Sequence, residues 1–549
     1  MNQIWAMLVK LIFIALAVSC LGFAVAFFLF EIDIENFLIA FFSLNEQASK
    51  FKYIVTPQKV LMISAIIFIT SLIAIYKMTY IKEYIAKELF WFHAICKDVI
   101  LSTLRIKTGI LIVLPAAVLL ILALTFTVTY DEALSYSMFI SRGPLISIAY
   151  YPVPNNHIFF SLLSTLLTSL ISLDPILIMR LLSIFSFIMS FFFIYKFLTL
   201  IVSKEVSTLI SAIYIAMPFS IYYGFLGRGY SLLVLIFFVC TYIIFLQIAE
   251  NKQTLKIGVF SILSAIGIFT IPTYIYAFLI NIVFIFLSRR KGSFQPIAKS
   301  ILLTFGISII FYSPAIIFSG VDAIVSNEYV ESKNRIQLFY NLPSFIFETF
   351  AIVVNSKPFA QFFLFSMLII AIKYCSKYRA KMDKVILTLF FVPILLIVLQ
   401  GVQPPPRVFI FWYSLAILPF YIFIYNEQRF FKFVNPLLLS ICIQVIVLTK
   451  TFGFPQTMIF NDPFAAKYSS IIAEDKISIL SSVDHMNTFL LYEKSINNYQ
   501  DMRVQYQQNV TIKDKKINYD WIILNSGEPA PLNYQEIYNE NGWVFFRNQ

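Results

Sequence analysis

Apolar runs of roughly 20 residues, separated by short polar segments, dominate the pattern of this chain. An α-helix needs a run of that length to cross the ~30 Å hydrocarbon core of a bilayer. The runs do not alternate with the period of two that marks the strands of an outer-membrane barrel. The pattern therefore predicts a polytopic α-helical membrane protein with about 13 transmembrane helices plus juxtamembrane helices. The expected spans are 4–30, 59–80, 108–129, 177–200, 205–223, 229–249, 255–271, 273–288, 299–318, 358–374, 384–402, 407–425 and 433–452.

The placement of lysine and arginine predicts the orientation of these spans, because cytoplasmic loops carry an excess of both. Loop 31–58 is acidic and loop 81–107 is basic, so we expect the N-terminus to be cytoplasmic. The apolar run 157–173 then decides the rest. If it crossed the membrane, three downstream basic clusters would fall outside. We therefore expect 157–173 to be a juxtamembrane helix, which leaves 319–357 and 453–549 on the extracytoplasmic side.

The chain divides into three zones of different composition. Residues 1–107 form an N-terminal two-helix addition with a basic cytoplasmic loop, and residues 108–452 form the transmembrane core. Residues 453–549 contain short apolar runs between polar turns, at 521–524 and 543–546, which predict strands. We expect this tail to be a small extracytoplasmic α/β domain of an integral plasma (inner) membrane protein.

Composition narrows the class of protein further. Of the 549 residues, 60% are apolar and 13% are charged, whereas a soluble domain has about 45–50% and about 25%. This excludes a soluble globular protein, a disordered chain and a coiled coil. The net charge of +12 does not indicate nucleic-acid binding, because in a membrane protein the positions of lysine and arginine in the loops matter more than their sum. Five cysteines without CxxC spacing argue against a disulfide framework.

Candidate chemistry begins directly after the span 108–129. Asp131 and Glu132 are adjacent acids at the end of an apolar helix, which is costly unless they pair, coordinate or catalyse. An alternative interpretation is a solvated helix end. Asn155, Asn156 and His157 then lead into the predicted juxtamembrane helix, where they are suited to orient a polar substrate. The alternative there is a simple helix N-cap.

These motifs, in this order, resemble the GT-C superfamily. Its members are integral-membrane glycosyltransferases that use polyprenyl-phosphate sugars, and they include protein O-mannosyltransferases and aminoarabinose transferases. The matching segments lie within about 105–450 and are Asp131-Glu132-Ala133, Asn155-Asn156-His157, Arg180-Leu181, Arg228-Gly229-Tyr230 and Pro406-Arg407. The superfamily's frequent His-Pro-Pro or Lys-Pro-Pro is Asn-Asn-His in this chain.

The resemblance implies a role for each matching residue. Asp131 and Glu132 are the expected catalytic residues: Asp131 as the general base, and Glu132 to position the acceptor or to help bind a metal. Arg228, Arg180 and Arg407 are expected to bind the donor phosphate, since planar guanidinium pairs well with oxyanions. Snorkelling to lipid headgroups is the alternative for arginine at a helix end. Asn155, Asn156, His157 and Tyr230 are expected to bind substrate. No cofactor is indicated, a divalent metal is left open, and His485 is interpreted as incidental.

The sequence thus predicts an inverting glycosyltransferase. It would move a sugar from a polyprenyl-phosphate donor to a lipid, cell-surface glycan or protein acceptor on the extracytoplasmic face. A transporter or flippase, or a polymerase, of lipid-linked saccharides is the alternative. The polar residues crowd one face and no internal repeat is visible, which favours the enzyme over the transporter.

Overall fold

The structure is a computed structural model. It describes isolated positions between 65 and 72 and residues 78–105, 109–250, 256–288, 294–325, 335–353, 355–375, 381–413, 435–451, 454–459, 461–507, 519–528, 531 and 534–548. The predicted span 4–30 and most of the predicted spans 59–80 and 407–425 lie outside these residues.

The membrane part is built from helices, as the hydropathy pattern predicts. Their bounds are α4 Met78–Arg105, α5 Ile110–Thr125, α6 Tyr130–Ser135, η2 Tyr136–Ile140, α7 Pro144–Ala149, α8 Ile158–Leu170, α9 Pro175–Thr199, α10 Lys204–Ala216, α11 Pro218–Phe225, α12 Tyr230–Ala249, α13 Ile257–Thr270, η3 Pro272–Tyr274, α14 Ile275–Ser288, α15 Gln295–Val325, α16 Arg335–Val353, α17 Lys357–Cys375, α18 Lys381–Gln400, η4 Pro406–Phe409, α19 Ile410–Tyr413, α22 Pro436–Thr451 and α23 Phe454–Thr457.

Five of the described helices are long and apolar enough to cross a membrane, and the number rises to seven if each of two bent pairs counts as one span. Four further apolar helices are shorter. The helical membrane architecture is thereby confirmed, while the predicted number of 13 spans is not. In one bent pair, α5 and α6–η2 meet at 71°. That bend turns α6 away from the direction of α5.

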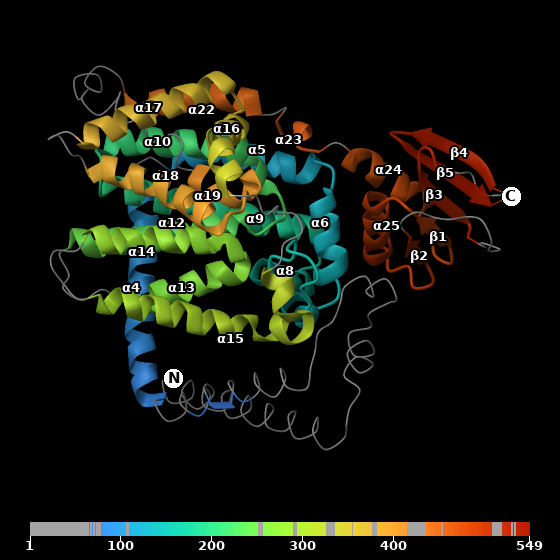
Figure 1. Ribbon diagram of the computed structural model, residues 1–549, viewed down its shortest axis with the longest axis horizontal. Helices are drawn as coiled ribbons and strands as arrows, with labels where there is room; N and C mark the ends of the chain where they lie inside the picture. The colour runs from blue at the N-terminus through green and yellow to red at the C-terminus, as the bar shows by residue number, and fades with distance from the viewer. Residues whose placement is uncertain are drawn as a thin grey trace.

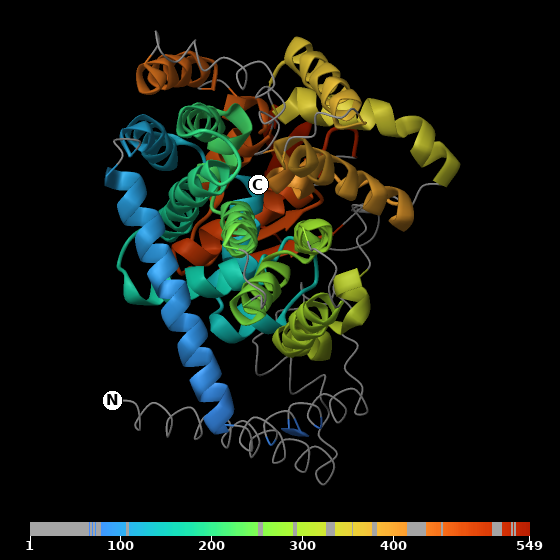
Figure 2. The same ribbon diagram turned by 90° about the vertical axis from the view of Figure 1, so that its left-hand side faces the viewer.

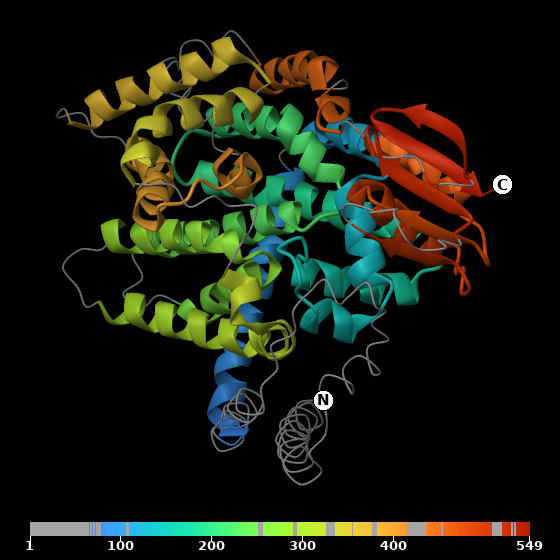
Figure 3. The same ribbon diagram turned by 45° about the vertical axis from the view of Figure 1, so that its right-hand side comes forward.

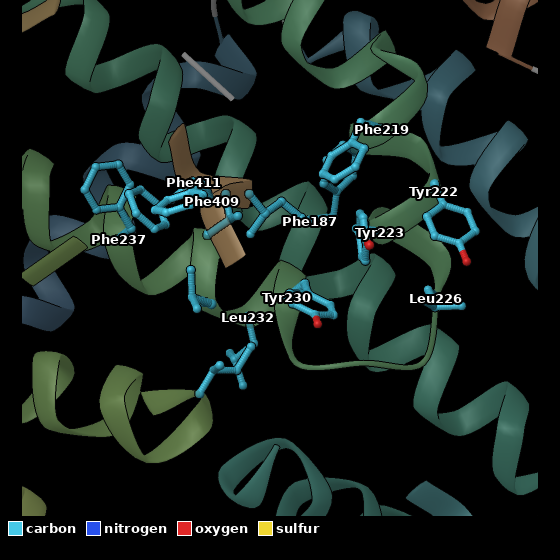
Figure 4. Close-up of a cluster of buried hydrophobic side chains, with 14 of the residues drawn as sticks. Phe187, Phe219, Tyr222, Tyr223, Leu226, Tyr230, Leu232, Phe237, Phe409 and Phe411 are labelled. Carbon is cyan, nitrogen blue, oxygen red and sulfur yellow. The ribbon is translucent and has the colours of Figure 1, made fainter. Parts of the chain in front are cut away.

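The long helices run side by side, and α4 runs crosswise to them (Figures 1 and 2). In the bundle, α12 packs closely against α9, α13 against α15 and α10 against α22. One large hydrophobic core runs between the helices. Phenylalanine and tyrosine rings fill it, and Figure 4 shows one such cluster around Phe187, Phe237 and Phe411. Each buried aromatic ring removes about 150–250 Å² from solvent or lipid, so these rings dominate the core.

The run 157–173 forms the helix α8 of 13 residues. At 1.5 Å per residue it is about 20 Å long, which is short of the ~30 Å hydrocarbon core. The length is compatible with the predicted juxtamembrane helix. The segment 319–357 was expected to be an external loop, but α15 continues to Val325 and most of the remainder forms α16.

The tail forms an α/β domain, as predicted. Its elements are α24 Asp462–Ile472, β1 Ser478–Ser481, α25 Asp484–Ile496, β2 Arg503–Tyr506, β3 Trp521–Asn525, β4 Tyr534–Glu540 and β5 Trp543–Asn548. The strand order is β2-β1-β3-β5-β4; β1 is parallel to β2 and β3, while β5 is antiparallel to β3 and β4. The first four residues of β3, Trp521 to Leu524, are all buried, which accounts for the continuous apolar run of this strand.

The α/β domain packs on the membrane bundle through α24 and α25. Figure 3 shows the sheet on the outer side of these two helices, with α6 on their other side. Helix α25 packs directly on α6. The domain therefore reaches the segment that carries Asp131.

The topology is tested by placing single cysteines at Ser203 and Ser288. Ser203 caps the start of α10, and Ser288 ends α14. If α8 does not cross the membrane, both positions face the cytoplasm, and an impermeant thiol reagent will label neither in intact cells. The free cysteines of the parent chain provide the background, and lysed cells provide the positive control. Labelling of both positions in intact cells would contradict this topology.

Candidate functional site

The site is organised around a buried ion pair between Glu132 and Arg180. Arg180 Nε donates to Glu132 Oε1 at 2.9 Å and Arg180 Nη2 donates to Oε2 at 2.8 Å. Glu132 is fully buried, and Thr129 N–H donates to its Oε2 at 3.1 Å. In return, Thr129 Oγ1 accepts from the backbone N–H of Glu132, which completes a capping box at the start of α6. The pair therefore fixes where α6 begins.

Arg180 has no donor left for a ligand. Beyond the two bonds to Glu132, its Nη1 donates to the carbonyls of Ala123 and Phe126, and its Nη2 donates to that of Thr127. A guanidinium carries five N–H groups, and all five are used within the protein. These contacts tie α9 to the bend between α5 and α6; the expectation that Arg180 binds the donor phosphate stays a prediction. Glu132 likewise holds structure together, through Thr129, Arg180 and Gly227, and its catalytic role stays a prediction.

Gly227 brings a second loop against the same carboxylate. Its N–H donates to Glu132 Oε1 at 2.8 Å. A Cβ at this position would lie 2.9 Å from Met179 Cβ and 3.0 Å from Glu132 Oε1, so only glycine fits without a shift of its neighbours. The close approach places the next residue, Arg228, beside α6.

Arg228 is 2% exposed, and its guanidinium contacts mostly uncharged groups. Nη1 donates to the Asp131 carbonyl at 3.0 Å and to Ser135 Oγ at 3.2 Å. Nη2 donates to Asn155 Oδ1 at 2.5 Å. Nε is buried and has no hydrogen-bond partner. A buried cation in this state is costly unless a further anion completes its environment.

Asp131 lies between Arg228 and Arg407. Its Oδ1 is 3.7 Å from Arg228 Nη1 and its Oδ2 is 3.9 Å from Arg407 Nη1. Both distances allow ion pairing but exceed the usual hydrogen-bond range. Asp131 is 27% exposed and Arg407 is 41% exposed, so both remain accessible.

His157 contributes no charge to this group. Burial, together with the neighbouring cations Arg228 and Arg407, holds the pKa of His157 well below its usual range, so the ring is neutral. Gly229 N–H donates to Nδ1 at 2.9 Å, which leaves the proton on Nε2. Nε2 then faces Arg228 Nη2 at 3.2 Å as a second donor without an acceptor between them.

The two asparagines of the same motif have different places. Asn156 is fully buried; its Nδ2 donates to the carbonyls of Ser147 and Tyr150, and its Oδ1 accepts from Ser161. It therefore shapes the loop, and the expectation that it binds substrate stays a prediction. Asn155 instead bonds Arg228 through Oδ1, while its buried Nδ2 has no partner.

Aromatic rings form one wall of the site. Tyr230 packs edge-on against His157, with ring centroids 4.8 Å apart, and against Tyr223, with centroids 4.7 Å apart. Figure 4 shows Tyr223 of α11 close to Tyr230 at the start of α12. The hydroxyl of Tyr151 is buried without a hydrogen-bond partner, and it lies close enough to Arg228 to interact with it electrostatically. Tyr151 and Ser135 were not among the predicted site residues; nothing in their spacing marks them.

The charges of the group formed by Arg228, Asp131 and Arg407 do not balance. Arg228 and Arg407 carry two positive charges, Asp131 carries one negative charge, and the Glu132–Arg180 pair is internally neutral. One positive charge is in excess. Unpartnered donors on Arg228, Asn155 and Tyr151 accompany it. The arrangement is suited to bind an anion with several oxygen acceptors.

A divalent cation does not fit this arrangement. Among the residues that the structure describes, no group of three or more His, Cys, Asp or Glu side chains is placed to hold a metal ion. Both oxygens of Asp131 face guanidinium groups, which would repel a cation. We therefore assign no metal ligand to Asp131 or Glu132.

Comparison with known proteins places the fold. No protein-family model and no curated protein sequence matches the chain. Its structure is similar to that of ArnT from Cupriavidus metallidurans in the apo state, with 12% identity, a TM-score of 0.52 and coverage of 82% of this chain and 98% of ArnT. It is also similar to the oligosaccharyltransferase of Archaeoglobus fulgidus in the apo form, with 11% identity, a TM-score of 0.45 and coverage of 76% and 69%.

Both proteins are membrane glycosyltransferases of the GT-C superfamily. The likeness to ArnT shows a shared fold. The resemblance to the GT-C superfamily that the motifs indicate is thereby confirmed at the level of the fold.

Replacement of Glu132 by glutamine tests the structural assignment of the ion pair. Breaking a buried pair by removing one charge typically costs about 3–5 kcal/mol, because the other charge stays buried. We expect Glu132→Gln to lower the apparent unfolding temperature in detergent markedly. Asp131→Asn, at the adjacent and partly exposed position, is the matched control and will unfold close to the parent. Equal unfolding temperatures for Glu132→Gln and the parent would contradict the assignment.

Proposed function

We propose that this protein is an inverting glycosyltransferase that moves a sugar from a polyprenyl-phosphate donor to a lipid, cell-surface glycan or protein acceptor on the extracytoplasmic face. The excess positive charge around Arg228, with its unpartnered buried donors, is the observation that carries this proposal. ArnT, whose fold the chain shares, is a membrane glycosyltransferase and supports the class of reaction.

The position of the group fits a donor that lies in the membrane. Arg228 and Tyr230 flank the start of α12, and His157 immediately precedes α8. Arg407 lies in η4, just beyond the end of α18. Side chains from these helix ends reach the same group: Arg228 and Arg407 lie beside Asp131 of α6, and His157 lies beside Arg228. Helix α6 lies between the bundle and the α/β domain (Figure 1). A polyprenyl tail would lie along the lipid-facing helices while its phosphate reaches these helix ends.

The charge of the donor matches the charge of the site. A polyprenyl-phosphate sugar is a phosphodiester and carries one negative charge, which balances the one excess positive charge. Arg228 and Arg407 would hold its oxygens, and the Nδ2 of Asn155 and the hydroxyl of Tyr151 would supply further donors. Binding would also place an acceptor between Arg228 Nη2 and His157 Nε2, which now face each other as donors.

Asp131 takes the proton in the transfer step. As the acceptor oxygen bonds to the anomeric carbon, the bond from that carbon to the phosphate oxygen breaks and its electron pair stays on the phosphate. The acceptor proton passes to Asp131, which is accessible and free of short hydrogen bonds to the arginines. Asp131 then becomes neutral and the site gains one positive charge. The released phosphate monoester carries a charge of about −1.5 to −2, so charge stays nearly balanced through the step.

Arg228→Lys tests the phosphate assignment. Lysine keeps the charge but loses the planar fork and several of its donors, so we expect weaker binding of undecaprenyl phosphate, the probe used here, by about tenfold or more. Titration into the purified protein in nanodiscs measures this. Arg503→Lys, at an exposed arginine on β2, is the matched control and will bind like the parent. Unchanged affinity in Arg228→Lys would exclude the phosphate role.

Asp131→Asn tests the general base. The amide is nearly isosteric but cannot accept the proton, and loss of a general base costs about 10²–10⁴ in rate. We expect transfer to fall by that factor while undecaprenyl phosphate still binds. The measurement is restoration of surface sugar, and of the polyprenyl-phosphate-sugar pool, in cells lacking this protein. Asp174→Asn is the control, because asparagine caps α9 as well as aspartate does. Full turnover in Asp131→Asn would refute the assignment.

A further inference from the structure

Tyr130, the residue before Asp131, is held by the α/β domain through three contacts. Its backbone N–H donates to Asp462 Oδ2 at 2.9 Å, and its hydroxyl donates to Asp484 Oδ2 at 2.9 Å. Its ring stacks on His485, with centroids 4.7 Å apart and planes inclined by 19°. These partners lie more than 300 positions away along the chain.

Asp462 connects these contacts to one another. While its Oδ2 accepts from Tyr130, its Oδ1 lies 2.8 Å from His485 Nε2. Asp462 is 6% exposed; its Oδ2 accepts the hydrogen bond from Tyr130, while His485 Nε2 lies close to Oδ1 without making a hydrogen bond. A buried carboxylate is costly unless it is bonded in this way. We call Asp462, Asp484 and His485 the Tyr130 cradle.

The cradle contacts the first turn of α6, where the helix supplies no hydrogen-bond acceptors for its own N–H groups. The first N–H groups of a helix have no partner within it. Thr129 supplies an acceptor for the N–H of Glu132, and Asp462 supplies one for the N–H of Tyr130 from another domain. The N-terminal turn of α6 is therefore held from inside by the Glu132–Arg180 pair and from outside by the cradle. Asp131 lies between these two attachments.

We propose that the cradle positions Asp131 for proton transfer, so that the α/β domain is part of the catalytic apparatus and its docking on α6 sets the rate of transfer. This inference rests on the proposed function. Asp462, Asp484 and His485 are positioning residues, since each of them contacts Tyr130 and would act on Asp131 through that residue. The interpretation of His485 as incidental is corrected by its contact with Tyr130.

The size of the effect follows from geometry. The base must lie within hydrogen-bond reach of the acceptor hydroxyl, and displacement by about 1 Å can cost ~10²-fold in rate. Loss of the cradle frees the N-terminal turn of α6 without touching the arginines. Phosphate binding should stay the same while turnover falls. A purely structural role would instead lower stability and binding together.

The test uses the full-length protein in nanodiscs, with Asp462→Ala as the main variant. Tyr130→Phe is the milder one, because it loses only the bond to Asp484. Asp501→Asn, at an exposed position of the same domain, is the matched control. Three quantities are measured: hydrogen exchange of a peptide covering 127–136, affinity for undecaprenyl phosphate, and restoration of transfer in cells lacking the protein.

We expect faster exchange of that peptide in Asp462→Ala, unchanged affinity for the lipid phosphate, and transfer reduced about tenfold or more. Tyr130→Phe should show the same changes at smaller size, and Asp501→Asn should show none. In the Asp131→Asn background, Asp462→Ala should cause no further loss of transfer, because it acts through Asp131.

Several results would overturn the inference. These are parental exchange or parental transfer in both Asp462→Ala and Tyr130→Phe, or a further loss of transfer when Asp462→Ala is added to Asp131→Asn. Failure of the proposed function is distinguishable from these, because it would appear in the parent protein as absent binding of undecaprenyl phosphate. In that event hydrogen exchange still decides whether the cradle holds α6.

Discussion

The ion pair between Glu132 and Arg180 is the constraint on which the rest of the site depends. It is buried, bidentate and saturated, and it joins α9, the bend after α5, the start of α6 and the loop at Gly227. Because its charges cancel and the donors of Arg180 are used, the pair fixes the geometry of the site. Its consequence is that Asp131 and Arg228 face each other at fixed positions.

A second consequence is that residues of the same type have different environments in this site. Adjacent acids take opposite roles, since Glu132 is buried in the pair while Asp131 remains accessible. The arginines divide in the same way: Arg180 has no free donor, whereas Arg228 has one buried donor without a partner. The environment of each residue, and not its type, distinguishes the buried Glu132–Arg180 pair from Asp131 and Arg228. The imbalance of one charge that results is the basis of the proposed anion site.

The sequence predicts the parts of this structure that depend on local pattern. Apolar length identifies most of the described membrane helices, and the apolar runs near Trp521 and Trp543 identify two strands of the α/β domain. Charged residues at the ends of apolar spans are costly unless they have a partner or a function. This identifies Asp131, Arg228 and Arg407. The pairing of Glu132 with Arg180 joins residues 48 positions apart, and spacing does not indicate it. His485 was missed for the same reason, since its significance comes only from a stack with a residue of another domain.

The most direct test of the central claim is a structure of the protein in nanodiscs with undecaprenyl phosphate, determined by cryo-electron microscopy. The account predicts density for the phosphate within hydrogen-bond distance of Arg228 and Arg407, with the Glu132–Arg180 pair unchanged. Phosphate density bound elsewhere, with Arg228 and Arg407 arranged as they are in the structure without a ligand, would contradict it.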